Sequence, residues 1–387
     1  MNKSWKLELL GSVATLQRGF DLAHRFRKQG DVPIVTSSGI ETTHSEAKVK
    51  GPGVVTGRYG TIGQVFFVET DFWPLNTTLY VRDFHNNDPL FVSYMLRRID
   101  FHTHSGKSGV PGVNRNDLHE IAVAVPPTKA EQEAIAEALS DVDALIESLE
   151  QLLVKKRQIK QGTMQELLTG KRRLPGFDGV WQSKMLAELF NFSGGYSASR
   201  DQLSANGYCY LHYGDIHTSS KTFVDVRAEF QEMPKLDIAL KKVTATSLLD
   251  DGDVVFVDAS EDDEGTSKHV VVSNPDKVPF ISGLHTIVAK GKTDELVHLY
   301  RHYCFQTPEV KAQFLFFAVG TKVSGISKRN IGKITLQMPP VNEQAAIATI
   351  LSDMDTDIAA LESRLAKARH IKQGMMQQLL TGKVRLI

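Results

Sequence analysis

This sequence has little cysteine, no long apolar run and no excess of one charge. Its two cysteines, Cys209 and Cys304, are too few for a disulfide framework, and neither belongs to a Cys-x-x-Cys pair. No segment approaches the roughly 18 apolar residues of a membrane span and no signal-peptide core follows the start, so we expect a cytoplasmic protein without a membrane partner. The 45 Lys and Arg residues balance 45 Asp and Glu residues. A surface that binds nucleic acid would therefore have to gather its basic residues on one face.

Complete catalytic and cofactor motifs are missing as well. Lys290-Gly291-Lys292-Thr293 resembles the end of a phosphate-binding P-loop, but the first glycine that this motif needs would fall at Thr286. Asn274-Pro275-Asp276 lacks the second proline and the aromatic residue of the box that adenine methyltransferases use, and no glycine-rich cofactor loop accompanies it. We therefore predict a chain that is not an enzyme and binds no cofactor.

Metal-ligating residue types occur, but in small groups. His298 and His302 lie one helical turn apart, and His102 and His104 alternate as on a strand, yet neither pair reaches the ligand number of a zinc site. The acidic segment 258–264 has oxygen ligands for a cation, but a solvated loop is the better interpretation of such a charge run. We predict no metal site.

The sequence does contain a long internal repeat. Glu131 to Leu174 and Glu343 to Leu386 align without a gap and are identical at roughly two thirds of their positions. A proline pair precedes each copy (Pro126-Pro127 and Pro339-Pro340), and the same Leu-Leu-Thr-Gly-Lys closes each. The chain is therefore built from two copies of one unit.

Each repeat copy has the pattern of one long helix. Thr128 and Glu131 fit a capping box at the start of the first copy, and Gly170 and Gly382 follow paired leucines as natural terminators in a left-handed cap. Forty residues correspond to a rod on the order of 60 Å long. Apolar residues step by four and three positions, as in the seam of a coiled coil. The predicted helix–helix seam consists of Ile135, Leu139, Val142, Ile146, Leu149, Leu153, Ile347, Leu351, Met354, Ile358, Leu361 and Leu365.

The segments outside the repeat have the pattern of α/β (α+β) globules. Strands are expected near residues 33–35, 53–56, 64–68, 79–81 and 121–125, and one helix near 89–99. The second globule is longer than the first and differs from it in the middle. Its end is again similar to that of the first globule, because Gly325 to Ile331 parallels Gly112 to Leu118. The predicted domains are a globule at 1–127, a helical spacer at 128–174, a second globule at 175–340 and a second spacer at 341–387.

This arrangement has a physical logic. Two like helices can pack antiparallel about a pseudo-twofold axis and hold two unlike globules at a fixed spacing. Two readers of this kind would recognise a target in two parts, and on DNA two half-sites about one helical turn apart fall within a rod on the order of 60 Å long. Gly162 and Gly374 lie inside the helices at equivalent positions and cost about 1 kcal/mol each relative to alanine, which suggests a bend or a close helix approach there.

Several motifs together resemble the specificity (S) subunit of Type I restriction-modification systems. They are the Trp-x-x-x-x-Leu openings at Trp5 and Trp181, the loop Gly57-Arg58-Tyr59-Gly60-Thr61-Ile62-Gly63, the strand that leads into Pro-Pro and Glu-Gln-x-x-Ile, and the Leu-Leu-Thr-Gly-Lys used twice. The resemblance covers essentially the whole chain. It implies two target recognition domains that bind double-stranded DNA, separated by helical regions that dock two methyltransferase (modification) subunits and the restriction (motor-nuclease) subunits. It also implies that S-adenosylmethionine and the base-flipping pocket belong to the modification subunit.

The resemblance also suggests which loop residues face DNA. Arginine and asparagine suit base edges, whereas lysine and serine suit phosphates. The expected DNA-binding residues are Arg58, Tyr59, Lys107, Asn114 and Arg115 in the first globule, and Lys322, Ser327, Lys328 and Arg329 in the second. Each of them is also consistent with a solvated turn or a cap at the end of a strand.

Two other functions remain open from the residues alone. A coiled-coil scaffold that joins two protein-binding globules without touching DNA agrees with the neutral net charge. A stand-alone adenine methyltransferase would need the cofactor loop and the catalytic box that are missing.

Overall fold

The computed structural model describes residues 5–105, 112–219, 221–260, 265–320 and 323–386, which form two compact units. Unit 1 comprises Met1–Leu152 and Leu361–Ile387, and unit 2 comprises Leu153–Ala360. Each unit therefore holds one globule together with the first part of one long helix and the last part of the other. None of the helices in the described residues has the length and apolarity that crossing a bilayer demands.

The globule of unit 1 is built mainly from antiparallel strands. Its sheets have the orders β2-β8-β5-β6 and β4-β3-β7, and the pair β1-β9 joins the beginning of the globule to its end. The central strand β5 is buried along its whole length, which explains its nearly continuous apolar sequence. The strands are β1 (Lys6–Leu9), β2 (Thr15–Arg18), β3 (Val32–Thr36), β4 (Gly39–His44), β5 (Gly53–Gly57), β6 (Val65–Val68), β7 (Trp73–Pro74), β8 (Thr78–Asp83) and β9 (Ala122–Val125).

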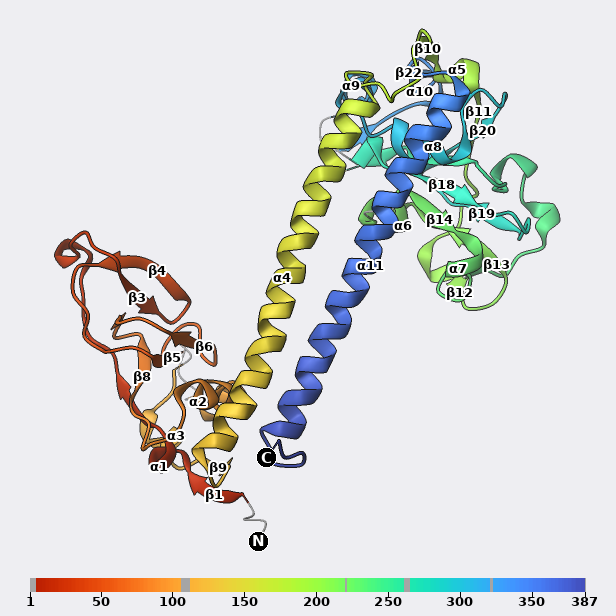
Figure 1. The fold of residues 1–387 in the computed structure, drawn as a ribbon. Helices are drawn as coiled ribbons and strands as arrows, with labels where there is room; N and C mark the ends of the chain where they lie inside the picture. The colour runs from red at the N-terminus through yellow and green to blue at the C-terminus, as the bar shows by residue number, and fades with distance from the viewer. Residues whose placement is uncertain (1–4, 106–111, 220, 261–264, 321–322, 387) are drawn as a thin grey trace. The chain divides into compact units, whose positions relative to one another are not determined.

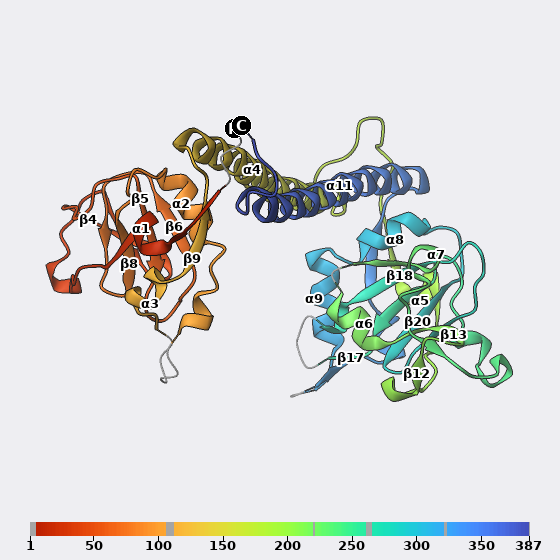
Figure 2. The same cartoon turned by 90° about the horizontal axis from the view of Figure 1, so that it is seen from below.

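Three short α-helices, α1 (Leu10–Val13), α2 (Pro89–Leu96) and α3 (Arg115–His119), belong to this globule together with the 3-10 helices η1 (His24–Phe26) and η2 (Phe101–His104). The local sequence fixes the start of α2, because the Asp88 carboxylate accepts a hydrogen bond from the Phe91 amide at 2.8 Å and Pro89 occupies the first helical position. α2 packs against β5 and β6 (Figure 2). The five strands and the helix predicted from the sequence are all present.

Unit 2 repeats the frame with more strands. A five-stranded sheet has the order β11-β20-β16-β18-β14, a four-stranded sheet has the order β12-β15-β13-β19, and β10-β22 pairs as β1-β9 does. The strands are β10 (Gln182–Met185), β11 (Phe190–Gly194), β12 (Leu203–Ser204), β13 (Tyr208–Leu211), β14 (Phe223–Asp225), β15 (Lys235–Leu236), β16 (Val254–Val257), β17 (Ala259–Ser260), β18 (His269–Ser273), β19 (Phe280–Ser282), β20 (Thr286–Gly291), β21 (Ser324–Gly325) and β22 (Thr335–Met338). The helices of the globule are α5 (Leu186–Leu189), α6 (Tyr213–Thr218), α7 (Val226–Glu229), α8 (His298–Cys304), α9 (Pro308–Phe317) and α10 (Lys328–Ile331).

The two repeat copies form the long helices α4 (Lys129–Leu167) and α11 (Val341–Leu379), which run antiparallel (Figure 1). The direction is visible in the ion pairs of each unit. In unit 1, Asp143 binds Lys372 at 2.5 Å and Glu150 binds Arg369 at 2.6 Å. In unit 2, Lys156 binds Asp357 at 2.9 Å and Lys160 binds Asp355. The mixed α/β fold with two long antiparallel helices and an internal repeat is therefore confirmed.

The helix ends follow their local signals. Gly170 and Gly382 both adopt the left-handed conformation with φ of +69°, as predicted. In each case the amide two residues later closes the cap, from Arg172 to the Glu166 carbonyl at 3.2 Å and from Val384 to the Gln378 carbonyl at 3.2 Å.

The capping box predicted at the start of α4 forms only in part. The Thr128 hydroxyl accepts a hydrogen bond from the Glu131 amide at 3.3 Å, but the Glu131 carboxylate binds the Trp5 indole N–H at 3.1 Å and the Arg385 guanidinium. We call this glutamate with its tryptophan and arginine partners a clamp. Unit 2 contains the same clamp: Glu343 accepts from Trp181 at 3.2 Å and from Arg173 at 2.6 and 2.7 Å.

The close helix approach suggested for Gly162 and Gly374 is wrong. A Cβ atom placed on either glycine has no neighbour within 4 Å among the described residues. The glycines therefore lie on open parts of the helix surfaces.

Candidate nucleic-acid interface

In unit 1 the loop after β5 is held by backbone hydrogen bonds on both sides. The amides of Arg58 and Tyr59 both donate to the Thr77 carbonyl, at 2.8 and 3.1 Å. The Arg58 carbonyl accepts from the Val113 amide at 3.0 Å, so the loop is tied to a second segment far along the chain. Gly60 has φ of +78°, a conformation that suits glycine at this turn. The backbone is fixed, and the side chains of Arg58 and Tyr59 are presented outward.

The second segment leads into α3. Asn114 caps this helix, because its side-chain oxygen accepts a hydrogen bond from the Asn116 amide at 3.0 Å. Arg115 follows at the first position of the helix and is exposed. A capping role and a DNA-binding role of Asn114 are thus compatible, since its oxygen is engaged while the residue itself lies on the surface.

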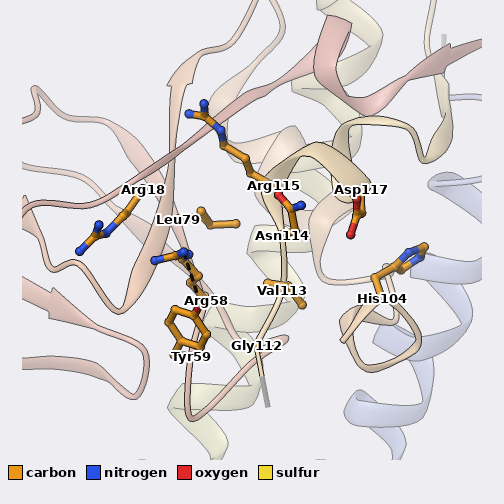
Figure 3. A pocket seen from close by; sticks show the side chains of 10 residues that line it. All are labelled: Arg18, Arg58, Tyr59, Leu79, His104, Gly112, Val113, Asn114, Arg115 and Asp117. Carbon is orange, nitrogen blue, oxygen red and sulfur yellow. Dashed lines mark hydrogen bonds between the residues drawn. The ribbon is translucent and has the colours of Figure 1, made fainter. Parts of the chain in front are cut away.

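These two segments line a hollow of about 660 Å³ (Figure 3). Arg58 stacks over the Tyr59 ring with its guanidinium carbon 4.5 Å from the ring centroid. Four of the expected DNA-binding residues meet here, and they are Arg58, Tyr59, Asn114 and Arg115. Lys107 lies outside the described residues.

The hollow also contains residues that the sequence did not suggest. Arg18 enters from β2, Asp117 from α3, and His104 from the 3-10 helix η2 (Phe101–His104). Arg18 is the last residue of β2, immediately before Gly19, and no strand was expected there, so this residue was not predicted from the sequence. With Arg18, three guanidinium groups surround the hollow against one carboxylate.

Such a surface suits an anionic ligand with planar hydrogen-bonding edges. Guanidinium groups make paired hydrogen bonds with phosphate oxygens or with guanine O6 and N7. Tyr59 is 43% exposed and can offer its hydroxyl to the same ligand. The three arginines make the surface of this hollow positive although the net charge of the chain is zero.

In unit 2 the expected residues Ser327, Lys328 and Arg329 open α10 and are exposed. The Ser327 hydroxyl caps the helix by accepting from the Asn330 amide at 3.2 Å. A nearby hollow of about 340 Å³ is lined by other residues, namely Tyr213, His217, Ala259, Ser260, His285 and Val323. Lys322 lies outside the described residues.

All twelve predicted seam residues are buried or half-buried. Those nearest the helix starts also join the cores of the globules: Ile135 and Leu139 pack in the core of unit 1, and Ile347 and Leu351 in that of unit 2. Each long helix therefore packs against the core of a globule as well as against the other long helix. No group of three or more metal-ligating residues occurs in the part of the chain that the structure describes.

Comparisons with known proteins identify relatives along most of the chain. The family described as the Type I restriction modification DNA specificity domain matches residues 2–157 and 179–368. The chain is 23% identical over 328 residues to the Type I restriction enzyme MjaVIII specificity subunit of Methanocaldococcus jannaschii, covering 77% of this chain and 70% of that protein. It is 25% identical over 318 residues to the putative type I restriction enzyme MjaX specificity subunit of the same organism, covering 77% and 69%.

Solved structures share the fold. The S subunit of a Type I restriction-modification system from M. genitalium superposes with a TM-score of 0.64 at 15% identity, covering 98% of this chain and 96% of that chain. A chain from a structural study of the assembly of a type I restriction-modification system gives a TM-score of 0.54 at 16% identity, covering 99% of both. With the family match over both globules and most of both long helices, the chain belongs to the Type I restriction-modification DNA specificity family.

Proposed function

We propose that this chain reads a bipartite, asymmetric DNA target as the specificity subunit of a Type I restriction-modification complex. The observation that carries the proposal is the repetition of one frame with different contents. Each unit ties a loop after its central strand to the segment before a short helix, through Val113 to Arg58 in unit 1 and Ile326 to Asp258 in unit 2. A shared frame with unlike side chains is suited to reading two different half-sites.

The arginine-lined hollow of unit 1 supports direct contact with DNA. Arg18, Arg58 and Arg115 provide charge for the phosphate backbone and paired donors for base edges. In unit 2, Lys328 and Arg329 provide the corresponding positive charge at the start of α10. Contacts to phosphates would hold the chain in place, and contacts to bases would set the sequence that it recognises.

The long helices would dock the partner subunits. Leu145, Leu152, Val154 and Ile159 are exposed on α4, and Ile371 on α11, although apolar side chains gain by leaving water. Because the helical repeat occurs twice, it would present two equivalent sites to two methyltransferase subunits, with restriction subunits joining the assembly. S-adenosylmethionine and the chemistry of methyl transfer would reside on those partners, and this chain would be non-catalytic.

The test is to express the chain with the modification subunit encoded beside it in a host without DNA methylation, and to sequence the methylated adenines. We expect a single motif with two specific parts separated by a gap of fixed length. A host genome without modification, with all subunits soluble and assembled, would contradict the proposal. That outcome would favour a coiled-coil scaffold that binds proteins through its two globules, an alternative that the neutral net charge supports.

A further inference from the structure

Asp258 in unit 2 occupies the position that Arg58 occupies in unit 1. The Arg58 amide donates to the Thr77 carbonyl at 2.8 Å, and its carbonyl accepts from Val113 at 3.0 Å. The Asp258 amide donates to the His285 carbonyl at 3.2 Å, and its carbonyl accepts from Ile326 at 2.8 Å.

The next residues agree with this correspondence. Tyr59 forms an antiparallel bridge with Gly112, and Ala259 forms one with Gly325. The two glycines were already equivalent in the sequence.

Neighbouring strands confirm the same alignment. Gly19 and Gly195 follow equivalent strands and donate to the carbonyls of Thr78 and Thr286, at 3.1 and 3.4 Å. Both threonines are buried, and each hydroxyl donates to the carbonyl three residues earlier, at 2.7 Å for Thr78 and 2.6 Å for Thr286. The equivalence of Arg58 and Asp258 therefore rests on the surrounding sheet as well as on one loop.

The chemistry at this shared position is reversed. Arg58 presents a cationic donor, whereas Asp258 presents an anionic acceptor. One carboxylate oxygen, Oδ1, is buried and lies 3.4 Å from His285 Nδ1, and it makes no hydrogen bond among the described residues. The side chain is still 34% exposed, so its exposed area lies on its other atoms, and Oδ2 is the oxygen left to accept a hydrogen bond from outside.

His285 lies beside this carboxylate and also lines a hollow with an aromatic wall. His285 has φ of +58°, a conformation that non-glycine residues seldom adopt, and its ring meets Tyr213 edge to face at a centroid distance of 5.4 Å. Both His285 and Tyr213 line the hollow of about 340 Å³. The Asp258 carboxylate therefore lies at the edge of this hollow, because His285, 3.4 Å from it, and Ala259, the next residue in the chain, both line the hollow.

We propose that Asp258 is a specificity-determining residue of the second DNA-reading site and accepts a hydrogen bond from the exocyclic amino group of cytosine. The proposal rests on the proposed function, that the chain reads DNA. A carboxylate is repelled by phosphates, so at a DNA surface it is suited to a base edge that offers a donor, and cytosine N4 is the usual partner of Asp and Glu in the major groove. The attraction to phosphates would come from Lys328 and Arg329, which follow Ile326 closely in the chain.

The experiment compares methylation by complexes that contain the wild-type chain, Asp258→Asn or Arg58→Ala, on duplexes carrying each base at every position of the wild-type motif. Asp258→Asn removes the negative charge and replaces one of the two acceptor oxygens with an NH2 donor, so it should relax the preference at one C·G pair by about tenfold or more. Arg58→Ala should change the other half of the motif, which identifies the half that unit 2 reads. Asp276→Asn is the matched control, because Asp276 lies in the same unit and is paired with Arg227 at 2.6 Å outside the hollow.

An unchanged base preference in Asp258→Asn, or a uniform loss of rate without a change in preference, would overturn the proposal. If Asp258→Asn fails to fold, Asp258→Glu takes its place: it keeps the carboxylate but moves it by one methylene, so it should lower the rate on the same base at that position, and an unaltered rate there would overturn the proposal equally. A wild-type complex without any bipartite motif would instead overturn the proposed function, and the role of Asp258 with it.

Discussion

Two histidines of unit 2 are held neutral by burial. His269 lies in the core with its ring centroid 5.1 Å from that of Phe305, and His302 stacks on Phe223 with the ring centroids 5.3 Å apart. Burial lowers the pKa of each imidazole to about 4. The nearby carboxylate of Asp355 opposes this pKa shift at His302 only in part. Protonation of either ring would place a charge in an apolar environment.

Unit 2 should therefore lose stability in mild acid. The unfolded chain binds protons at these histidines below a pKa of about 6.5, whereas the folded unit binds them only near pH 4, so stability falls as the pH drops between these values. Substitution of His302→Phe keeps the stacked ring, removes one proton-binding group, and should make the decline shallower. Hydrogen exchange, followed separately for the peptides of each unit from pH 7 to pH 4.5, measures how the stability of unit 2 changes with pH. His24→Phe, at an exposed site in unit 1, is the control; equal protection of wild-type unit 2 at both pH values would contradict the expectation.

At the scale of single residues, the sequence predicted which backbone positions of the two units correspond better than it predicted which distant residues contact each other. Gly112 and Gly325 were matched from the sequence, and the bridges at both confirm the match. The role proposed for Asp258 was not predictable, because the carbonyl that binds its amide and the ring beside its carboxylate both belong to His285, whose counterpart in unit 1 is the unlike residue Thr77. Likewise, Glu131 was expected to cap its own helix, but it binds an arginine 254 positions away, and no local pattern contains that information.

Among the elements, the long helices carry the clearest stability prediction. A Cβ atom added at Gly162 in α4 or at Gly374 in α11 would meet no atom of the described residues within 4 Å, and neither glycine has a positive φ. Alanine fits both sites without strain and should stabilise each helix by about 1 kcal/mol.

Thermal unfolding of Gly162→Ala, Gly374→Ala and the double variant measures this effect. Gly57→Ala serves as the opposite control, because its Cβ would lie 1.8 Å from the Thr61 carbonyl oxygen and should destabilise unit 1. A loss of methylation in the alanine variants, with raised stability, would show that a partner subunit approaches these open glycines.

Elements with strong local signals were predictable, and those defined by distant partners were not. The repeat, its proline entry and its glycine caps predicted α4 and α11, including the left-handed ends. The two-residue strands β12, β15, β17 and β21 of unit 2 have no such signal. They exist because a partner segment supplies their hydrogen bonds, and a segment of two residues has no periodicity to detect.

For the whole molecule, the proposal predicts that the two helices together set the gap in the DNA motif. The units divide at Leu152 and Leu153 in α4 and at Ala360 and Leu361 in α11. Seven residues inserted at both places keep the helix faces in phase and add about 10 Å to each helix. The gap should lengthen by about three base pairs, at about 3.4 Å each, while both specific halves stay the same.

The control is the same insertion in α4 alone. With only α4 extended, residues of α4 would be displaced by seven positions from their ion-pair partners on α11, as Lys156 would be from Asp357. We therefore expect lower thermal stability and weak methylation. Methylome sequencing of each complex measures the gap. A gap of unchanged length in the doubly extended protein would remove the helices from the spacing mechanism.

The clamp at Glu131 also bears on the order in which the protein is made. Leu379 and Leu380 complete the core of unit 1, Arg98 donates to the Leu380 carbonyl at 2.7 Å, and Arg385 closes on Glu131. The ribosome produces all of unit 2, from Leu153 to Ala360, before Leu379, Leu380 and Arg385 emerge. Domains usually mature from the N-terminus onward during synthesis. The globule of unit 1 is translated first but completes its core last, because that core stays incomplete until the end of α11 has been synthesised.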